Sequence, residues 1–214
     1  MLSLCVRSIK LMNGVEALTR VLNKDEAQVA SAKALEALAM RERDGGFQLL
    51  LRHASVALWG ALDASVPQFV AAYLREFPDL LRTEGFARVK LPAVALLTTS
   101  ESDVWSEIVL ELERNFGAPL KKGIGRFECL LEAIGLGRPI ETDQRRDLLE
   151  LSQVRNLIVH KFGVVDARFA TNCPWLKVAV GDRLALSFED YGRYYAAALN
   201  YVATIVETAR GLLA

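Results

Sequence analysis

The chain has 214 residues, which is enough for one well-buried domain and short for two. Hydrophobic residues make up 52% and charged residues 24%, a balance typical of a globular protein rather than a disordered one. Lys plus Arg and Asp plus Glu each number 26, so the formal net charge is zero, which argues against a protein that coats nucleic acid through bulk charge. Residues 114–168 are mildly positive, with ten Lys or Arg against seven Asp or Glu. Scattered solvated charges are the simpler interpretation of that window.

The three cysteines are Cys5, Cys129 and Cys173. They are odd in number and far apart, so the sequence predicts neither a disulfide framework nor a cysteine-based zinc site, and it favours a reducing compartment. The longest uncharged apolar run, 194–206, is too short to cross a bilayer and contains Asn200. Arg7 and Lys10 interrupt any apolar core of a secretory signal. We therefore expect a cytoplasmic protein with no membrane association.

Two helices are predicted in the first third of the chain. Residues 25–42 have small and apolar residues at three- and four-residue spacing, Asp25 is a plausible N-cap, and Gly45-Gly46 ends the unit. Residues 47–77 predict a longer helix that is apolar on more than one side, as expected in the middle of a bundle. Pro67 either kinks this helix or breaks it.

The middle of the chain is less regular. Residues 79–104 are less clear: 82–85 resemble a turn, and 89–97, interrupted by Pro92, can be a loop or a short helix. Ser102 or Asp103 is a candidate cap for a helix over 104–116, and a short helix is predicted over 124–134. A break rich in glycine follows it.

The clearest amphipathic helix is predicted over 143–162. Thr142 resembles an N-cap, and leucines, valine and isoleucine form a stripe suited to burial. Gly163 is a natural C-cap.

The last part of the chain predicts a β-hairpin near 177–186 and a final helix over 188–212 capped by Ser187. The expected fold is all-α: an antiparallel helical bundle with this one small hairpin. We expect a single domain, with a helical extension over 1–44 and a core over 45–212.

Several common catalytic motifs are missing. The sequence contains no His-Glu-x-x-His spacing and no nucleophile elbow, which argues against a zinc hydrolase and a serine hydrolase. Residues 121–126 have neither the spacing nor the ending of a P-loop. The simpler interpretation of this stretch is a flexible entry to the next helix. The alternative is a phosphate-contacting loop that uses Lys121, Lys122 and Arg126.

One segment carries a family resemblance. Residues 155–160 read Arg-Asn-Leu-Ile-Val-His, Gly163 follows, and residues 166–169 form an Asp-x-Arg-Phe segment. This pattern resembles the signature helix of the HEPN superfamily, and more narrowly its RiboL-PSP-HEPN branch. The resemblance is specific over 148–169 and looser over the rest of 45–212. An acidic residue of the first core helix, Asp63 here, also resembles the family pattern.

The resemblance implies a metal-independent endoribonuclease of the toxin or phage-defence type, with no cofactor. It implies a homodimer in which Arg155, Asn156 and His160 of both chains line a shared cleft. RNA is the implied substrate, and an antitoxin or a defence protein is an implied partner. Lys161 is a candidate RNA contact, and Asp63 a candidate accessory acid. Ion pairing or capping is the simpler role for Asp63.

The residue types suit this chemistry. Imidazole transfers protons near neutral pH, and a guanidinium matches the charge and shape of a phosphate. At about 100° per residue, Asn156 and His160 lie about 40° apart on one helix face. Arg155 lies about 140° from His160 and converges only if its side chain bends round or the helix end unwinds. Near the helix C-terminus the dipole favours imidazolium.

Three alternatives stay open. In the first, the polar and basic residues at the end of the helix over 143–162 have no catalytic role and only suit the negative end of the helix dipole. The chain can also be a non-catalytic HEPN-like module that binds RNA or protein, or an oligomerisation unit.

The second histidine, His53, lies on the apolar helix over 47–77 and is expected to be structural.

Overall fold

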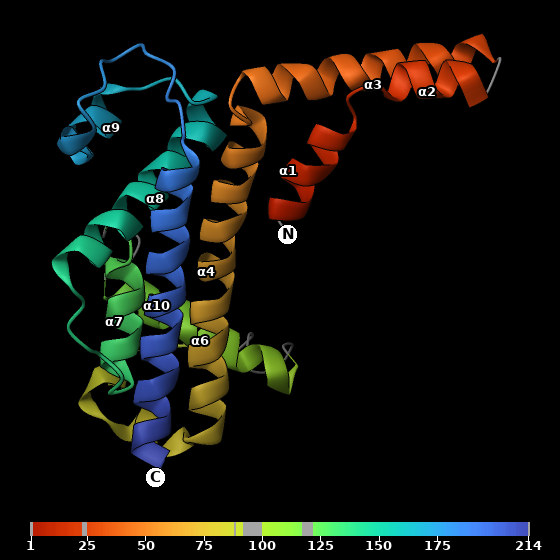
Figure 1. Ribbon diagram of the computed structural model, residues 1–214. Helices are drawn as coiled ribbons and strands as arrows, with labels where there is room; N and C mark the ends of the chain where they lie inside the picture. The colour runs from red at the N-terminus through yellow and green to blue at the C-terminus, as the bar shows by residue number, and fades with distance from the viewer. Residues whose placement is uncertain (1, 23–24, 88, 92–99, 117–121, 214) are drawn as a thin grey trace.

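The computed structural model describes residues 2–22, 25–87, 89–91, 100–116 and 122–213. Within these ranges the chain is helical and forms no β-strand, which confirms the all-α class. The two termini lie on different parts of the molecule, the N-terminus on an arm and the C-terminus at the far end of the bundle (Figure 1). None of the described helices combines the length and apolar character needed to span a bilayer.

The arm consists of α1 (Leu2–Leu11), α2 (Val15–Leu22) and α3 (Glu26–Asp44). It projects sideways from one end of the bundle (Figure 1). The Glu36 carboxylate ties α2 to α3, because it accepts the backbone N–H groups of Gly14 at 2.9 Å and Glu16 at 3.0 Å. Gly46 and Phe47 both have positive φ, and this turn redirects the chain from α3 into the bundle.

The bundle is built around α4 (Gln48–Glu76), which packs against α6 (Glu101–Asn115), α7 (Gly125–Ala133), α8 (Thr142–Lys161) and α10 (Phe188–Leu213). Figure 1 shows α4 and α10 running side by side, with α8 inclined to them and in contact with both. Pro67 lies inside α4 without ending it, so the long central helix is one element. Shorter elements join the helices: η1 (Pro78–Arg82), η2 (Glu84–Phe86), α9 (Ala167–Asn172) and η4 (Pro174–Leu176).

The predicted stripe of α8 forms part of the core. Leu148, Leu151 and Val154 are fully buried, and Leu157 is nearly so. They join Leu51 and other buried side chains of the neighbouring helices. Burial of each such side chain stabilises the fold by about 1.5–3 kcal/mol. The exposed residues of α8 lie near its two ends, at Thr142, Asp143, Arg145 and Arg146 and at 159–161.

A buried carboxylate ties α8 to the chain that follows it. Glu150 has no exposed surface, and it accepts hydrogen bonds from Trp175 Nε1 at 2.5 Å, Tyr194 Oη at 2.5 Å and Arg193 Nη2 at 3.0 Å. Burial, and then the Glu150 charge, raise the pKa of the Cys173 thiol to about 12. Because Trp175 lies in η4, this cluster holds the chain after α9 against α8.

The predicted caps are partly right. Asp25 accepts the Ala27 N–H and caps α3, and Ser187 accepts the Asp190 N–H at the start of α10. The cap of α6 is Ser100, two residues before the predicted Ser102. Thr142 is the first residue of α8 rather than its cap, and no side chain caps this end.

The end of α8 also differs from the prediction. Its C-cap is Phe162, which has a left-handed φ of 53°, and Gly163 follows with φ 79°. The Gly163 N–H reaches back to the Leu157 carbonyl at 3.1 Å. A Cβ on Gly163 would lie 3.3 Å from the Arg52 guanidinium, so both the backbone conformation and the packing favour glycine here.

The predicted hairpin over 177–186 is wrong. Lys177 has φ 51°, which turns the chain, and residues 181–184 pair with Gly163 and Val165 instead. The N–H groups of Gly181 and Leu184 donate to the carbonyls of Val165 and Gly163, both at 2.9 Å. Two side chains of α4 supply hydrogen bonds that a second strand would otherwise make. Gln48 bonds the backbone N–H and carbonyl of Leu186, and Arg52 donates to the Leu184 carbonyl.

Candidate functional site

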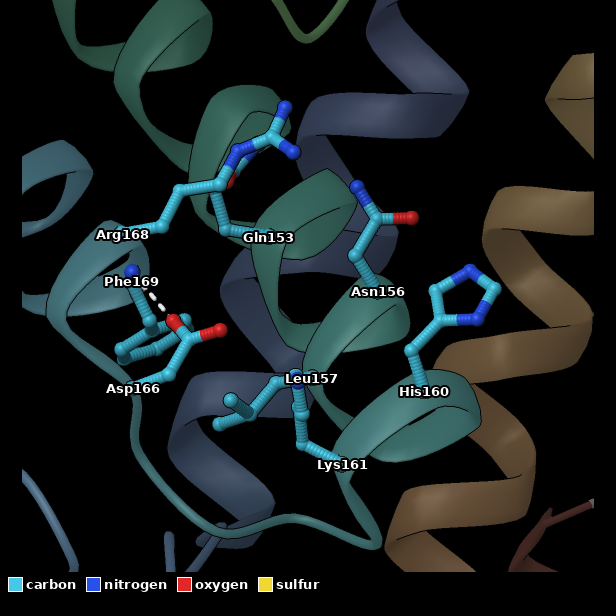
Figure 2. Close-up of a pocket in the computed structure, with 8 residues that line it drawn as sticks. All are labelled: Gln153, Asn156, Leu157, His160, Lys161, Asp166, Arg168 and Phe169. Carbon is cyan, nitrogen blue, oxygen red and sulfur yellow. Dashed lines mark hydrogen bonds between the residues drawn. The ribbon is translucent and has the colours of Figure 1, made fainter.

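The last two turns of α8 form one wall of an open pocket of about 330 Å³, here called the His160 pocket (Figure 2). Its polar lining residues are Gln153, Asn156, His160, Lys161, Asp166 and Arg168. Figure 2 shows the Asn156 amide and the His160 ring on the same side of α8, as their spacing predicts. His160 is exposed, so a large ligand has access to its imidazole.

The other wall comes from the start of α9. Asp166 caps this helix by accepting the Phe169 N–H at 2.8 Å, and the capped turn sets the direction of Arg168 (Figure 2). Leu157 and Phe169 are buried and form the apolar base of the pocket. Arg168 thus enters the pocket from a separate element that the core holds against α8.

Arg155 lines a second, adjacent pocket of about 290 Å³, here called the Lys122 pocket. Its polar lining residues are Asp63, Lys122, Arg126, Ser152, Arg155 and the shared Gln153, Asn156 and Arg168. The Arg155 Nη1 donates to the Asn156 Oδ1 at 3.0 Å, so the arginine is connected to the His160 pocket through the amide. Gln153, Asn156 and Arg168 form the wall between the two pockets.

A chain of amides holds Lys122 in place. Its ammonium donates to Asn172 Oδ1 at 2.6 Å, and Asn172 Nδ2 donates to Gln153 Oε1 at 2.8 Å. Gln153 Nε2 then donates to Ser152 Oγ at 3.2 Å. Asn172, Gln153 and Ser152 are all buried. The loop before α7 is therefore connected to α9 by a partly buried hydrogen bond and through it to α8 by buried ones, which are stronger there than in water.

Arg126 and Asp63 face each other in the Lys122 pocket. The Arg126 guanidinium lies 3.1 Å from Asp63 and 3.7 Å from Glu113. Each of the three side chains is less than a third exposed. These carboxylates offset the Arg126 charge, which leaves it less available for an anion than the sequence suggests.

The remaining cations of the two pockets have no carboxylate partner among the residues that the structure describes. Lys122 and Arg155 donate to amide oxygens, and within the same part of the chain Lys161 and Arg168 make no side-chain hydrogen bond or ion pair. By contrast, Arg145 and Arg193 of the same bundle pair with carboxylates. The positive charge at the two pockets is thus only partly balanced, although the whole chain is neutral.

Most of the predicted site residues lie at these two pockets. Asn156, His160 and Lys161 line the His160 pocket. Arg155, Lys122, Arg126 and Asp63 line the Lys122 pocket. Lys121 lies outside the described residues. His53 is exposed on α4 and lines neither pocket.

Two residues of the shared wall, Gln153 and Arg168, were not among the site residues predicted from the sequence. Gln153 precedes Asn156 by three residues and His160 by seven, a spacing that places all three on one helix face. That spacing is a signal that sequence alone offers. Arg168 belongs to the Asp-x-Arg-Phe segment of the family resemblance, but only the packing of α9 on α8 places it at the site.

Comparison with known proteins adds no relative: no protein-family model matches the chain, and neither does a curated protein or a solved structure.

Proposed function

We propose that this protein is an endoribonuclease of the HEPN type that cleaves RNA without a metal ion, by attack of the ribose 2′-oxygen on the adjacent phosphorus. One observation carries the proposal: Asn156 connects the Arg155 guanidinium to the pocket that contains His160. A group suited to proton transfer, His160, and a group suited to phosphate binding, Arg155, thus lie near the Asn156 amide at the exposed end of α8. The partly unbalanced positive charge of both pockets suits a polyanion.

The reaction forms a bond between the 2′-oxygen and phosphorus and breaks the bond between phosphorus and the 5′-oxygen. The 2′-hydroxyl loses a proton and the leaving 5′-oxygen gains one. His160 accepts and returns this proton, since imidazole does both near neutral pH. Arg155 stabilises the negative charge that develops on the phosphorane oxygens, and Asn156 orients Arg155. The products carry a 2′,3′-cyclic phosphate and a 5′-hydroxyl.

A homodimer is part of the proposal. One imidazole has to serve first as base and then as acid if a single chain acts alone. Two copies of the motif around one cleft would divide these roles between two histidines. A cytoplasmic setting and an antitoxin or defence partner are also proposed, and they rest on the family resemblance of residues 148–169.

The test is cleavage of a labelled RNA in the presence of EDTA, with analysis of the product ends. The proposal predicts cleavage that EDTA does not abolish, with 2′,3′-cyclic phosphate ends. Loss of cleavage in EDTA, or 3′-hydroxyl ends, would refute the mechanism. RNA binding with no cleavage would favour the alternative, a non-catalytic HEPN-like module that binds RNA.

A further inference from the structure

The proposed chemistry does not use the Lys122 end of the second pocket. Lys122 lines the Lys122 pocket and is absent from the lining of the His160 pocket. It enters from the loop before α7, whereas Arg155 and Asn156 come from α8. The pocket is a similar volume to its neighbour, about 290 Å³, and opens beside the shared wall. It therefore has room for a group of its own.

The Lys122 ammonium is both positioned and available. One of its three N–H groups donates to Asn172, which leaves two for a ligand. Its partner Asn172 is buried and is held in turn by Gln153. A cation fixed in this way loses less conformational entropy on binding than a free surface lysine does. Because its partner is neutral, its charge attracts an anion.

The shared wall places two anion positions in line. The cleaved phosphate is placed at Asn156, and Lys122 lies on the other side of the wall that Gln153, Asn156 and Arg168 form. Arg168 lines both pockets and has no ion-pair partner among the described residues. A nucleic-acid strand repeats its phosphates along its length, so a strand that crosses this wall brings a second phosphate into the Lys122 pocket.

We infer that the Lys122 pocket is a binding subsite for the phosphate adjacent to the one that is cleaved, with Lys122 as its main ligand and Arg168 bridging both phosphates. This inference rests on the proposed function, because it places the cleaved phosphate at Asn156. The substrate is accordingly a single strand with at least two successive phosphodiesters, and a single nucleotide is a poor ligand.

The test measures binding rather than cleavage. The probe is a trimer of 2′-O-methyl ribonucleotides, which lacks the attacking hydroxyl and has two charged phosphodiesters. The comparison trimers have the same bases, with one or the other phosphodiester replaced by a neutral methylphosphonate. Affinities of the full-length protein for the three trimers are measured by calorimetry at one fixed salt concentration.

The unsubstituted protein should bind the fully charged trimer about tenfold more tightly than the neutralised trimers, as expected for one charge-assisted contact. Lys122→Gln retains a donor for Asn172 but loses the charge. The preference should therefore fall to about twofold or less over the trimer whose methylphosphonate occupies the Lys122 pocket, and stay near tenfold over the other trimer. Lys122→Arg should restore it. Lys33→Gln, an exposed lysine of α3 that lines neither pocket, serves as the matched control.

Salt dependence provides a second readout on a longer single-stranded RNA. Loss of one phosphate contact should reduce the slope of log K against log salt by about 0.7 in Lys122→Gln. Equal binding of the charged and neutralised trimers, an undiminished preference in Lys122→Gln, or no binding of any trimer would overturn the inference. None of these binding results would refute the proposal that the protein cleaves RNA with His160. Conversely, the expected trimer preference without cleavage would refute only the enzymatic proposal.

Discussion

The guanidinium of Arg155 donates a hydrogen bond to the side-chain oxygen of Asn156 at 3.0 Å. The two residues are neighbours in sequence, about 100° apart on the helix, and the arginine side chain bends round to make this contact. Asn156 thus sets the direction of the Arg155 charge, which in the proposed function meets the phosphate.

This pairing predicts non-additive effects on catalysis. Arg155→Gln and Asn156→Ala should each lower kcat/KM for RNA cleavage, by about 10- to 100-fold, if each removes about 1.4–2.7 kcal/mol of transition-state stabilisation. The double variant should lose less than the product of the two effects, since Asn156 acts through Arg155. A double-mutant cycle measures this coupling. Strictly multiplicative losses would contradict the positioning role of Asn156.

The end of α8 predicts a stabilising substitution. Phe162 has φ 53° and is 81% exposed, so it adopts a strained backbone conformation and buries little surface. The left-handed conformation costs about 1–2 kcal/mol for a residue with a Cβ. Glycine avoids this cost but loses about 0.4–1 kcal/mol through its greater freedom in the unfolded chain. Phe162→Gly should therefore raise the free energy of unfolding by about 0.5 kcal/mol.

The matched control is Phe162→Ala, which removes the same ring but keeps the strained backbone. It should not stabilise the protein, and urea unfolding of both variants measures the difference. Equal stability of the glycine and alanine variants would show that the backbone conformation at Phe162 is not the source of strain.

The Glu150 cluster predicts a large loss of stability. Glu150→Ala removes the acceptor of Trp175, Tyr194 and Arg193 and leaves the arginine close to α8 with fewer partners. Arg193 keeps Asp147 and Asp190, so the main cost is that the donors of Trp175 and Tyr194 lose their acceptor, at about 1–3 kcal/mol each. Glu132→Ala, a change of the same type at an exposed position of α7, should cost much less. Urea unfolding tests this, and similar midpoints for the two variants would contradict the role of Glu150.

The start of α10 predicts a pH dependence of stability. Burial disfavours the charged form of Asp190, but hydrogen bonds from Ser187 and Arg193 outweigh this and lower the pKa of its carboxyl. A lowered pKa contributes stability that is present above the unfolded value of about 3.9 and is lost as the pH falls through the folded value. Asp190→Asn should therefore weaken the loss of stability on acidification. Urea unfolding between about pH 6 and about pH 3 measures it, and an unchanged pH slope would contradict this.

The sequence predicts a helix correctly where the burial of one apolar face is enough to determine it. The stripe of Leu148, Leu151, Val154 and Leu157 predicts α8 correctly, because one face of the helix has to be apolar. The hairpin was not predictable, because the partner of residues 181–184 lies at 163–165 and not in the adjacent run. Side chains of α4, more than 130 residues away, donate hydrogen bonds to backbone carbonyls of this segment. The local sequence pattern does not predict such distant contacts.

The site was predictable only along α8. Helical spacing correctly places Asn156 and His160 on one face, but it leaves the reach of Arg155 undecided. The link between Lys122 and Asn172 joins residues 50 apart, and Arg168 reaches the site through the packing of α9. Such contacts depend on tertiary structure, and no periodicity in the sequence predicts them.

The most direct test of the proposed function is the rate of RNA cleavage in EDTA by the unsubstituted protein, His160→Ala and His53→Ala. Both histidines are exposed, but only His160 lines the pocket at the end of α8. Loss of proton transfer should reduce the rate by about 10²- to 10⁴-fold in His160→Ala, and His53→Ala should cleave at the unsubstituted rate. Equal rates for His160→Ala and the unsubstituted protein would contradict the central claim that His160 transfers the proton in RNA cleavage.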